Sequence, residues 1–200
     1  MTATALFPTL LWQADLADAA LLADLAHSAR TLADDDRAGR AWSKAHAYRG
    51  YTSYASLNDL PRRDPAFADL ARWLVAQAAQ FAAAAHLDFA GKKPRLDSLW
   101  VNILKPGGSH SGHIHPYSSL SGTLYLEVPD GAGAIRFEDP RLPMLMHSPP
   151  RLPDAPEAMR NFVHVQPRPG LLLLWESWLR HEVMPNGAKA DRISISFNFA

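Results

Sequence analysis

The most informative segment of this chain is residues 100–129, WVNILKPGGSHSGHIHPYSSLSGTLYLEVP. Two apolar runs flank a Pro-Gly-Gly turn and three closely spaced histidines, His110, His113 and His115. Alternate residues of an extended strand point to the same face, so His113 and His115 should project together. A metal ion needs that arrangement from two ligands on one strand, although a His-x-His pair alone also occurs on ordinary surfaces.

Short apolar or alternating segments make up the second half of the chain, and Gly, Pro, Asn and Asp separate them. They lie at 98–104, 120–128, 133–138, 162–166, 170–176 and 192–199. Many short strands with turn residues between them are typical of a sandwich or jelly-roll barrel. The last segment alternates strictly, with Ile and Phe on one face and Arg, Ser and Asn on the other. That polar face is either exposed or lines a ligand cavity.

Helices are predicted in the first half. Apolar residues recur at near-helical spacing from Ala14 to about Arg37. A second helix should begin at Pro65, after the N-cap residue Asp64, and end near His86. Between them, the aromatic and threonine content of residues 41–57 favours extended chain.

We therefore predict a single α+β domain over residues 1–200, mainly β, in which a helical part at about 1–97 packs on one sheet of a core at about 98–200. The connection at 140–161 contains six prolines and no evident element. A connection of this length is either a lid at the mouth of the barrel or a mobile surface excursion.

Composition excludes several classes of protein. Lys+Arg and Asp+Glu balance at 20 each, so no basic surplus exists to attract nucleic acid. Cysteine is absent, which excludes disulfides and thiolate chemistry and fits a reducing compartment. The first residues lack a basic leader, and the apolar run LLLLW at 171–175 is too short to cross a bilayer. We predict a soluble cytoplasmic protein that does not associate with membranes.

A further histidine, His181, follows this apolar run in LLLLWESWLRHEVMPN, residues 171–186. Together with residues 100–129, the motifs GAIRFEDPR (133–141), WLRHEV (178–183) and RISISFN (192–198) resemble a bacterial family of 2-oxoglutarate- and iron(II)-dependent oxygenases. The resemblance extends from about Trp100 to Phe199 and more loosely includes GYTSY at 50–54. It implies that the barrel is a double-stranded β-helix, the cupin-like form of the jelly roll.

The resemblance also implies an enzyme that uses O₂ and couples decarboxylation of 2-oxoglutarate to oxidation, by hydroxylation, of an unidentified substrate. His113, His115 and His181 would hold the iron(II). Arg192 would bind the distal carboxylate of 2-oxoglutarate, since its guanidinium fork matches a carboxylate. Ser194 and Tyr125 would assist, and Asn102 is a further candidate for lining the cavity. The substrate would be a small molecule or a peptide side chain, and a homodimer is compatible with the sequence.

Alternatives remain at several positions. Most such oxygenases hold iron with two histidines and one carboxylate, but His115 stands where the carboxylate is expected. We favour a three-histidine set, while Glu138 or Asp139 could supply a carboxylate and His110 could replace one of the pair. The candidates for the substrate pocket are Trp175, Trp178 and His110, although both tryptophans also suit a core.

Two other functions compete with the oxygenase prediction. A three-histidine cupin-type dioxygenase would oxidise its substrate without 2-oxoglutarate, and the Pro-Gly followed by His-Ile-His matches the start of the cupin pattern. Position 120, however, is Leu instead of the expected glutamate, and the spacing from Gly170 to His181 is too long for the second cupin motif. The other alternative is a non-enzymatic jelly-roll binding module whose metal is structural or absent.

Overall fold

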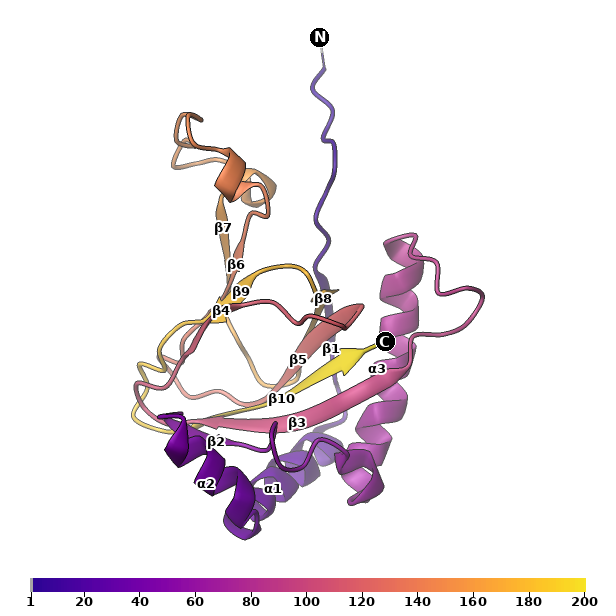
Figure 1. Cartoon of the computed structure of the whole chain (residues 1–200), viewed down its shortest axis with the longest axis vertical. Coiled ribbons are helices and arrows are strands. Elements are labelled where there is room, and N and C mark those ends of the chain that lie inside the picture. Colours follow the sequence, from indigo (N-terminus) through magenta and orange to yellow (C-terminus); the bar gives the residue numbers. More distant parts are fainter. Residues whose placement is uncertain (1) are drawn as a thin grey trace.

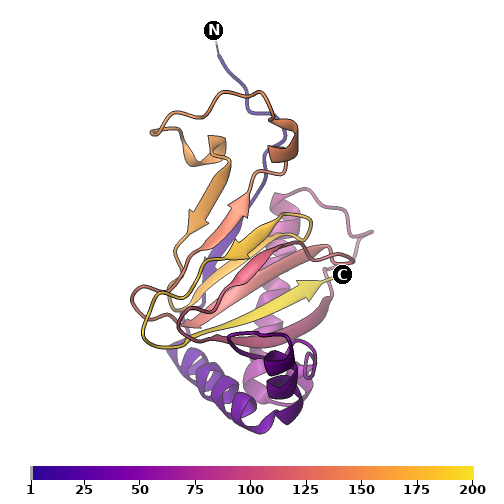
Figure 2. The ribbon, with the colours of Figure 1, turned by 60° about the vertical axis from the view of Figure 1, so that its left-hand side comes forward.

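Two antiparallel sheets form the body of the computed structural model, which describes residues 2–200. The larger sheet has the strand order β1-β8-β5-β10-β3-β2 and the smaller sheet the order β4-β9-β6-β7. The strands are β1 (Trp12–Asp15), β2 (Gly50–Thr52), β3 (Leu96–Leu104), β4 (His110–His113), β5 (Leu120–Glu127), β6 (Ile135–Glu138), β7 (Phe162–Val165), β8 (Leu171–Glu176), β9 (His181–Val183) and β10 (Arg192–Phe199). The ribbon shows the smaller sheet lying against one face of the larger one (Figures 1 and 2).

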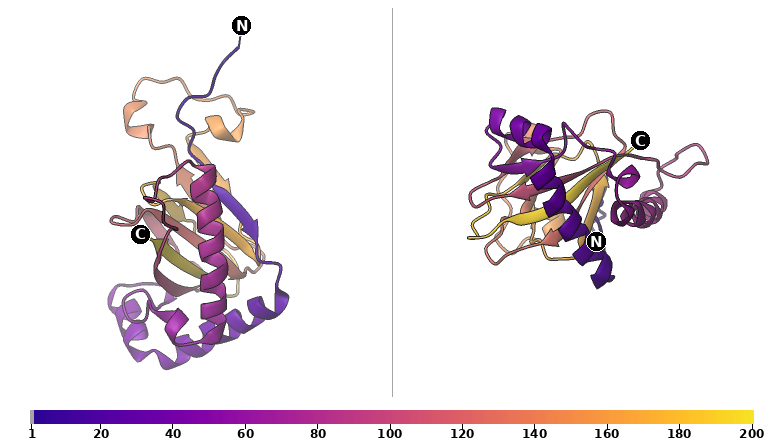
Figure 3. Two further views of the ribbon diagram at one scale, coloured as in Figure 1. Left: turned by 90° about the vertical axis from the view of Figure 1, so that its right-hand side faces the viewer. Right: turned by 90° about the horizontal axis from the view of Figure 1, so that it is seen from below.

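Three α-helices pack around the larger sheet: two lie on its opposite face, and one lies beside its edge strand β2 (Figure 3). They are α1 (Ala19–Asp35), α2 (Arg37–Ala45) and α3 (Pro65–Ala84), and short 3₁₀ turns lie at Leu60–Arg62, Leu142–Met144 and Glu157–Met159. The carboxylates of Asp18, Asp36 and Asp64 each accept a backbone N–H in the first turn of the helix that follows. Such caps satisfy donors that have no partner within the helix.

Strand alternation divides the interior into two layers. Along β10, Ile193, Ile195, Phe197 and Phe199 face the helices and join an apolar core with α1 and α3. A second core, which includes Tyr125, Phe137 and Trp175, lies between the two sheets. The predicted mainly β arrangement with helices on one sheet is therefore confirmed, and the polar face of β10 points into the space between the sheets, where Arg192, Ser194, Ser196 and Asn198 line a cavity.

Two local predictions in the first half are wrong. The helix predicted from Ala14 begins only at Ala19, because Trp12–Asp15 pair with β8 and the cap at Asp18 starts the helix later. Residues 41–45, predicted as extended chain, belong to α2, which begins after its N-cap Asp36. The aromatic residues there favoured a strand, but the cap and the packing of α2 against β2 override that local preference.

The Pro-rich connection at 140–161 lies at the tip of the hairpin formed by β6 and β7, which projects from the body near the N-terminal segment (Figure 1). None of its residues belongs to either core or lines the cavity between the sheets in the described chain. A role as a lid stays a prediction. Among residues 2–200, no helix has both the length and the apolar character needed to cross a bilayer.

Candidate metal centre and cavity

A β-bulge positions the histidines of β4. This strand pairs with β9 so that His113 lies opposite His181 and His110 lies opposite Val183. Three steps along β4 therefore match two steps along β9. In a regular strand, residues three apart face opposite sides, but the extra residue re-aims the chain, and both His110 and His113 line the cavity.

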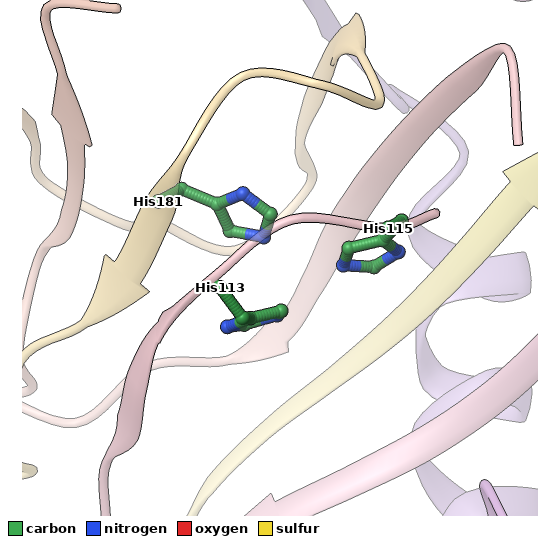
Figure 4. A group of neighbouring side chains, drawn as sticks. All are labelled: His113, His115 and His181. Carbon is green, nitrogen blue, oxygen red and sulfur yellow. The ribbon is translucent and has the colours of Figure 1, made fainter. Parts of the chain in front are cut away.

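His115 lies just beyond the end of β4, where its backbone N–H donates to the Ser177 carbonyl at 3.0 Å. The three rings lie close together. The ring centroid of His113 is 5.1 Å from that of His115 and 4.4 Å from that of His181, and the centroids of His115 and His181 are 5.1 Å apart. One nitrogen from each ring lies within 4.8 Å of the other two. Figure 4 shows the three rings gathered around a common point.

The Nδ1 atom of each ring is hydrogen bonded to an oxygen atom. Nδ1 of His113 lies 2.7 Å from the Ser111 carbonyl, and Nδ1 of His181 lies 2.9 Å from the Leu179 carbonyl. For His115 the partner is the side-chain oxygen of Asn198, at 2.7 Å. These oxygens accept hydrogen bonds, so each Nδ1 carries a proton, and in the neutral form of the ring Nε2 keeps a free lone pair. The three Nε2 atoms are thereby left to bind a metal ion. In metal-binding histidines one ring nitrogen usually binds the metal while the other donates a hydrogen bond.

Burial favours the neutral form of two of these rings, His115 and His181. It lowers the pKa of His181 to about 3, although the hydrogen bond from the ring to the Leu179 carbonyl acts in the other direction. Burial also lowers the pKa of His115 against the effect of its Asn198 contact. A neutral imidazole is the form that binds a metal, so His115 and His181 are ready as ligands at neutral pH.

The three histidines line one wall of a cavity of about 480 Å³ between the two sheets. This volume lies within the range of roughly 300–1,000 Å³ typical of small-molecule sites. Most of its lining is apolar or aromatic, and Arg192 is the only Lys, Arg, Asp or Glu among the lining residues of the described chain. The cavity is therefore suited to one anionic group at the Arg192 end and to neutral groups elsewhere.

Arg192 is itself almost fully buried, at 2% exposure. Its Nη1 donates to the Gly133 carbonyl at 3.2 Å, but its Nε has no hydrogen-bond partner among residues 2–200. The ring centroid of Tyr125 lies 5.5 Å from the guanidinium carbon, and the Tyr125 hydroxyl also has no hydrogen-bond partner among residues 2–200. Burial lowers the pKa of Arg192 and raises that of Tyr125 to about 12. Unpaired buried donors are costly, and a bound carboxylate would satisfy both of them.

The other residues predicted for the site fall into two groups. Asn102, His110, Trp175 and Ser194 all line the cavity, and the indole N–H of Trp175 has no partner in residues 2–200. His110 is hydrogen bonded through Nε2 to the Tyr48 hydroxyl at 2.7 Å, and burial lowers its pKa to about 3. Trp178 does not line the cavity; its half-exposed indole donates to Glu176 at 3.0 Å.

Neither alternative carboxylate lies in the cluster of ring nitrogens. Glu138 pairs with Arg180 at 3.3 Å, and Asp139 pairs with Arg141 at 3.0 Å. The described residues that approach closely enough to share an ion are the three histidines alone. The geometry therefore favours three imidazoles over a mixed set.

Sequence reasoning missed several residues of this site. Nothing in the sequence indicated that Asn198 would contact His115, or that Ser121 and Ser177 would complete the network, with Ser121 donating to Asn198 at 2.8 Å. It also missed five aromatic residues that line the cavity, which are Trp42, Tyr48, Tyr54, Trp100 and Tyr117. Only the alternation of β10 gave a signal, because it placed Asn198 on the polar face.

Comparison with known proteins identifies the class. Residues 98–198, just over half of the chain, match the family described as "Putative 2OG-Fe(II) oxygenase". The chain belongs to this family of 2-oxoglutarate- and iron(II)-dependent oxygenases and is an oxidoreductase. The predicted resemblance to 2-oxoglutarate- and iron(II)-dependent oxygenases is thereby confirmed, and the bacterial origin of the family stays a prediction. A search of curated proteins finds no significant match to the sequence.

Solved structures show the same fold at low sequence identity. A Pseudomonas putida prolyl-4-hydroxylase superposes with a TM-score of 0.65 at 19% identity, covering 96% of this chain and 92% of that one. The epimerase SnoN, solved with Fe³⁺, α-ketoglutarate and nogalamycin RO, gives 0.65 at 19% identity, covering 96% and 79%. HygX from Streptomyces hygroscopicus, with nickel and 2-oxoglutarate bound, gives 0.62 at 16% identity, covering 96% and 83%. These likenesses confirm the double-stranded β-helix.

The residues of this chain fit the cofactors of its family. Three imidazole nitrogens that lie this close together are suitable ligands for iron(II). The unpaired Arg192 and Tyr125 donors suit a dicarboxylic co-substrate whose far end must be held away from the metal.

Proposed function

We propose that His113, His115 and His181 hold the iron(II) through their Nε2 atoms and that Arg192 binds the distal carboxylate of 2-oxoglutarate. The observation that carries the proposal is the pairing of two features in one cavity: three ring nitrogens within 4.8 Å of one another, and a buried guanidinium whose Nε has no partner in residues 2–200. Tyr125 would donate to the same carboxylate, and Ser194 and Asn102 would form the adjacent wall.

Bound iron(II), with 2-oxoglutarate and O₂, supplies the oxidising chemistry, in which decarboxylation is coupled to substrate oxidation. The protein's own residues bind, orient and exclude water. The hydrogen bonds that the three Nδ1–H groups donate fix the tautomer and the plane of each ring. The apolar residues Ile135 and Trp175 line the cavity, and a site of this kind can exclude water from a reactive centre.

A three-histidine set changes the charge of the centre. Where a carboxylate ligand is replaced by a neutral imidazole, the site carries one more positive charge and favours anionic ligands more strongly. This supports chelation by a dicarboxylate co-substrate.

The wider features of the protein follow the same proposal. We propose that residues 1–97 and 98–200 act as one domain and that the substrate is a small molecule or a peptide side chain. Hydroxylation is the oxidation we favour. A cytoplasmic location and a possible homodimer remain predictions from the sequence.

The test is an anaerobic titration of iron(II) with 2-oxoglutarate, in which chelation gives a weak visible charge-transfer band. Arg192→Met should weaken 2-oxoglutarate binding about 10- to 100-fold, because a charged hydrogen bond is lost, while iron binding is retained. Arg168→Met is the matched control, since Arg168 is exposed and pairs with Asp15. Equal 2-oxoglutarate affinity in wild type and Arg192→Met would remove the assignment. On admission of O₂, substrate oxidation without succinate would indicate the cupin-type reaction instead.

A further inference from the structure

The outer end of the cavity is lined by aromatic side chains that the proposed cofactor site does not use. Tyr54 and Trp100 are in edge contact, with ring centroids 5.2 Å apart. Trp100 in turn stacks near His115, at 6.1 Å between centroids. Trp42 and Tyr117 complete this group, which we call the aromatic rim. The rim thus leads from the protein surface to one of the three clustered histidines.

Two unfavourable features coincide at Tyr117, as they do at Phe7, but of these two residues only Tyr117 lines the cavity. Its side chain is fully exposed to solvent, and its backbone has a φ of +69°. A bulky side chain rarely adopts a positive φ, and glycine would adopt it without strain. Strained residues of this kind concentrate at functional sites. A large ring held at such a position on the rim of the cavity is consistent with contact to a ligand.

The electrostatics of the cavity restrict what that ligand can be. The charges of bound iron(II) and of the 2-oxoglutarate dianion would cancel. The guanidinium of Arg192 would then give the inner end of the cavity one net positive charge, which disfavours a cation nearby. An anion would be attracted by that charge, but with Arg192 already occupied it would find no second Lys or Arg to pair with among the lining residues of the described chain. A neutral group meets neither difficulty. Aromatic faces and edges at the rim are complementary to a flat ring, since such rings pack favourably in stacked and edge-to-face contacts.

We infer that the aromatic rim, formed by Trp42, Tyr54, Trp100 and Tyr117, binds an uncharged flat ring of the substrate and presents it to the metal centre. This inference rests on the proposed function and narrows its substrate class to molecules or side chains that carry a neutral aromatic ring.

The test uses the whole protein with zinc in place of iron and with saturating 2-oxoglutarate, so that the Arg192 end is filled. Ligand-observed NMR then measures binding of 4-methylphenol and of matched probes that change one property each: the anion 4-hydroxyphenylacetate, the cation tyramine and the saturated ring 4-methylcyclohexanol. A neutral blocked tyrosine, N-acetyltyrosinamide, distinguishes a peptide-borne ring from a free one. We expect 4-methylphenol or N-acetyltyrosinamide to bind at least fivefold more tightly than the two charged probes and the saturated ring.

Two variants assign that binding to the rim. Tyr117→Gly removes the ring and relieves the positive φ, so it should fold normally, yet it should weaken 4-methylphenol binding about three- to tenfold. Phe7→Gly is the matched control, because Phe7 is also exposed and has a φ of +57°, but it does not line the cavity. The inference would be overturned if a charged probe bound more tightly than 4-methylphenol, if the saturated ring bound equally well, or if no probe bound at all. Equal effects of the two variants would also overturn it. Failure of the proposed function is recognised separately, as a protein that does not bind 2-oxoglutarate at all.

Discussion

The hydrogen bond that each Nδ1–H donates decides which nitrogen a clustered histidine offers to a metal. Two of the three acceptors are backbone carbonyls, which a side-chain substitution cannot remove. The third is the side chain of Asn198, held in turn by Ser121. His115 is therefore the ring whose orientation can be tested by mutation outside the ligand set.

Asn198→Ala should reduce metal affinity about 10- to 100-fold, because His115 loses the acceptor that fixes its tautomer and plane. Competition with a chromophoric chelator measures the change. Asn58→Ala, at an exposed position outside the cavity, is the control and should bind metal as the wild type does. An unchanged affinity in Asn198→Ala would show that the contact does not orient a ligand.

At the residue scale, sequence reasoning found the residue types but not their partners. The clustering of the three histidines and the place of Arg192 in the cavity lining were predictable, because these residue types and their spacing are distinctive. The contact between His115 and Asn198 joins residues 83 positions apart in the sequence. Such a contact depends on strand register, which short-range patterns do not specify.

Among the elements, α2 and the segment after it form the wall that carries Tyr48, Thr52 and Tyr54 into the cavity lining. The carboxylate of Asp36 holds this region together. It caps α2 through the Gly39 N–H at 2.9 Å and accepts hydrogen bonds from Tyr51, at 2.9 Å, and Ser56, at 2.5 Å. Burial alone would raise the pKa of Asp36, but these hydrogen bonds together outweigh it and hold the pKa below its ordinary value.

Because the pKa of Asp36 is lower in the folded than in the unfolded state, its contribution to stability is fully present above the unfolded value of about 3.9 and is lost as pH falls through the folded pKa. Asp36→Asn should lower the free energy of unfolding by about 1–2 kcal/mol at pH 7. Denaturant titrations at several pH values should show this difference shrinking below about pH 4. A difference that is constant down to pH 2.5 would contradict the ionised network.

Strand patterns predicted the elements of the β core more accurately than the helical part. The six predicted β segments correspond to β3, β5, β6, β7, β8 and β10. The β4 bulge was not predictable, since it follows from pairing with β9, some seventy residues away. It explains why His110, three residues before His113, shares the cavity with it.

For the molecule as a whole, the hairpin tip at 140–161 is the segment whose role is least defined by the sequence and the fold. It lies outside both cores and the cavity lining of the described chain. Replacing residues 140–160 by an Asn-Gly turn should therefore preserve the fold and leave 2-oxoglutarate affinity within about twofold. Thermal unfolding and the anaerobic titration measure both properties. If the tip closes over the substrate, succinate formation stimulated by substrate should fall while 2-oxoglutarate binding is kept; loss of 2-oxoglutarate binding itself would contradict this description of the tip.

The overall architecture was predictable because alternation and turn residues define a β barrel, and the resemblance to the oxygenases placed the histidines on it. The aromatic rim was not, since it combines Trp42 from α2, Tyr54 from the loop after β2, and Tyr117 from the turn after β4. No local pattern links those three positions.

Iron(II) affinity measured anaerobically for single-histidine variants tests the proposed centre most directly. The wild type should bind one iron(II) per chain. His113→Ala, His115→Ala and His181→Ala should each weaken binding by more than the ~100-fold that an outer hydrogen-bond partner contributes, whereas His164→Ala, at an exposed position in β7, should leave it unchanged. Wild-type affinity in any of the three cluster variants would contradict the three-histidine iron centre.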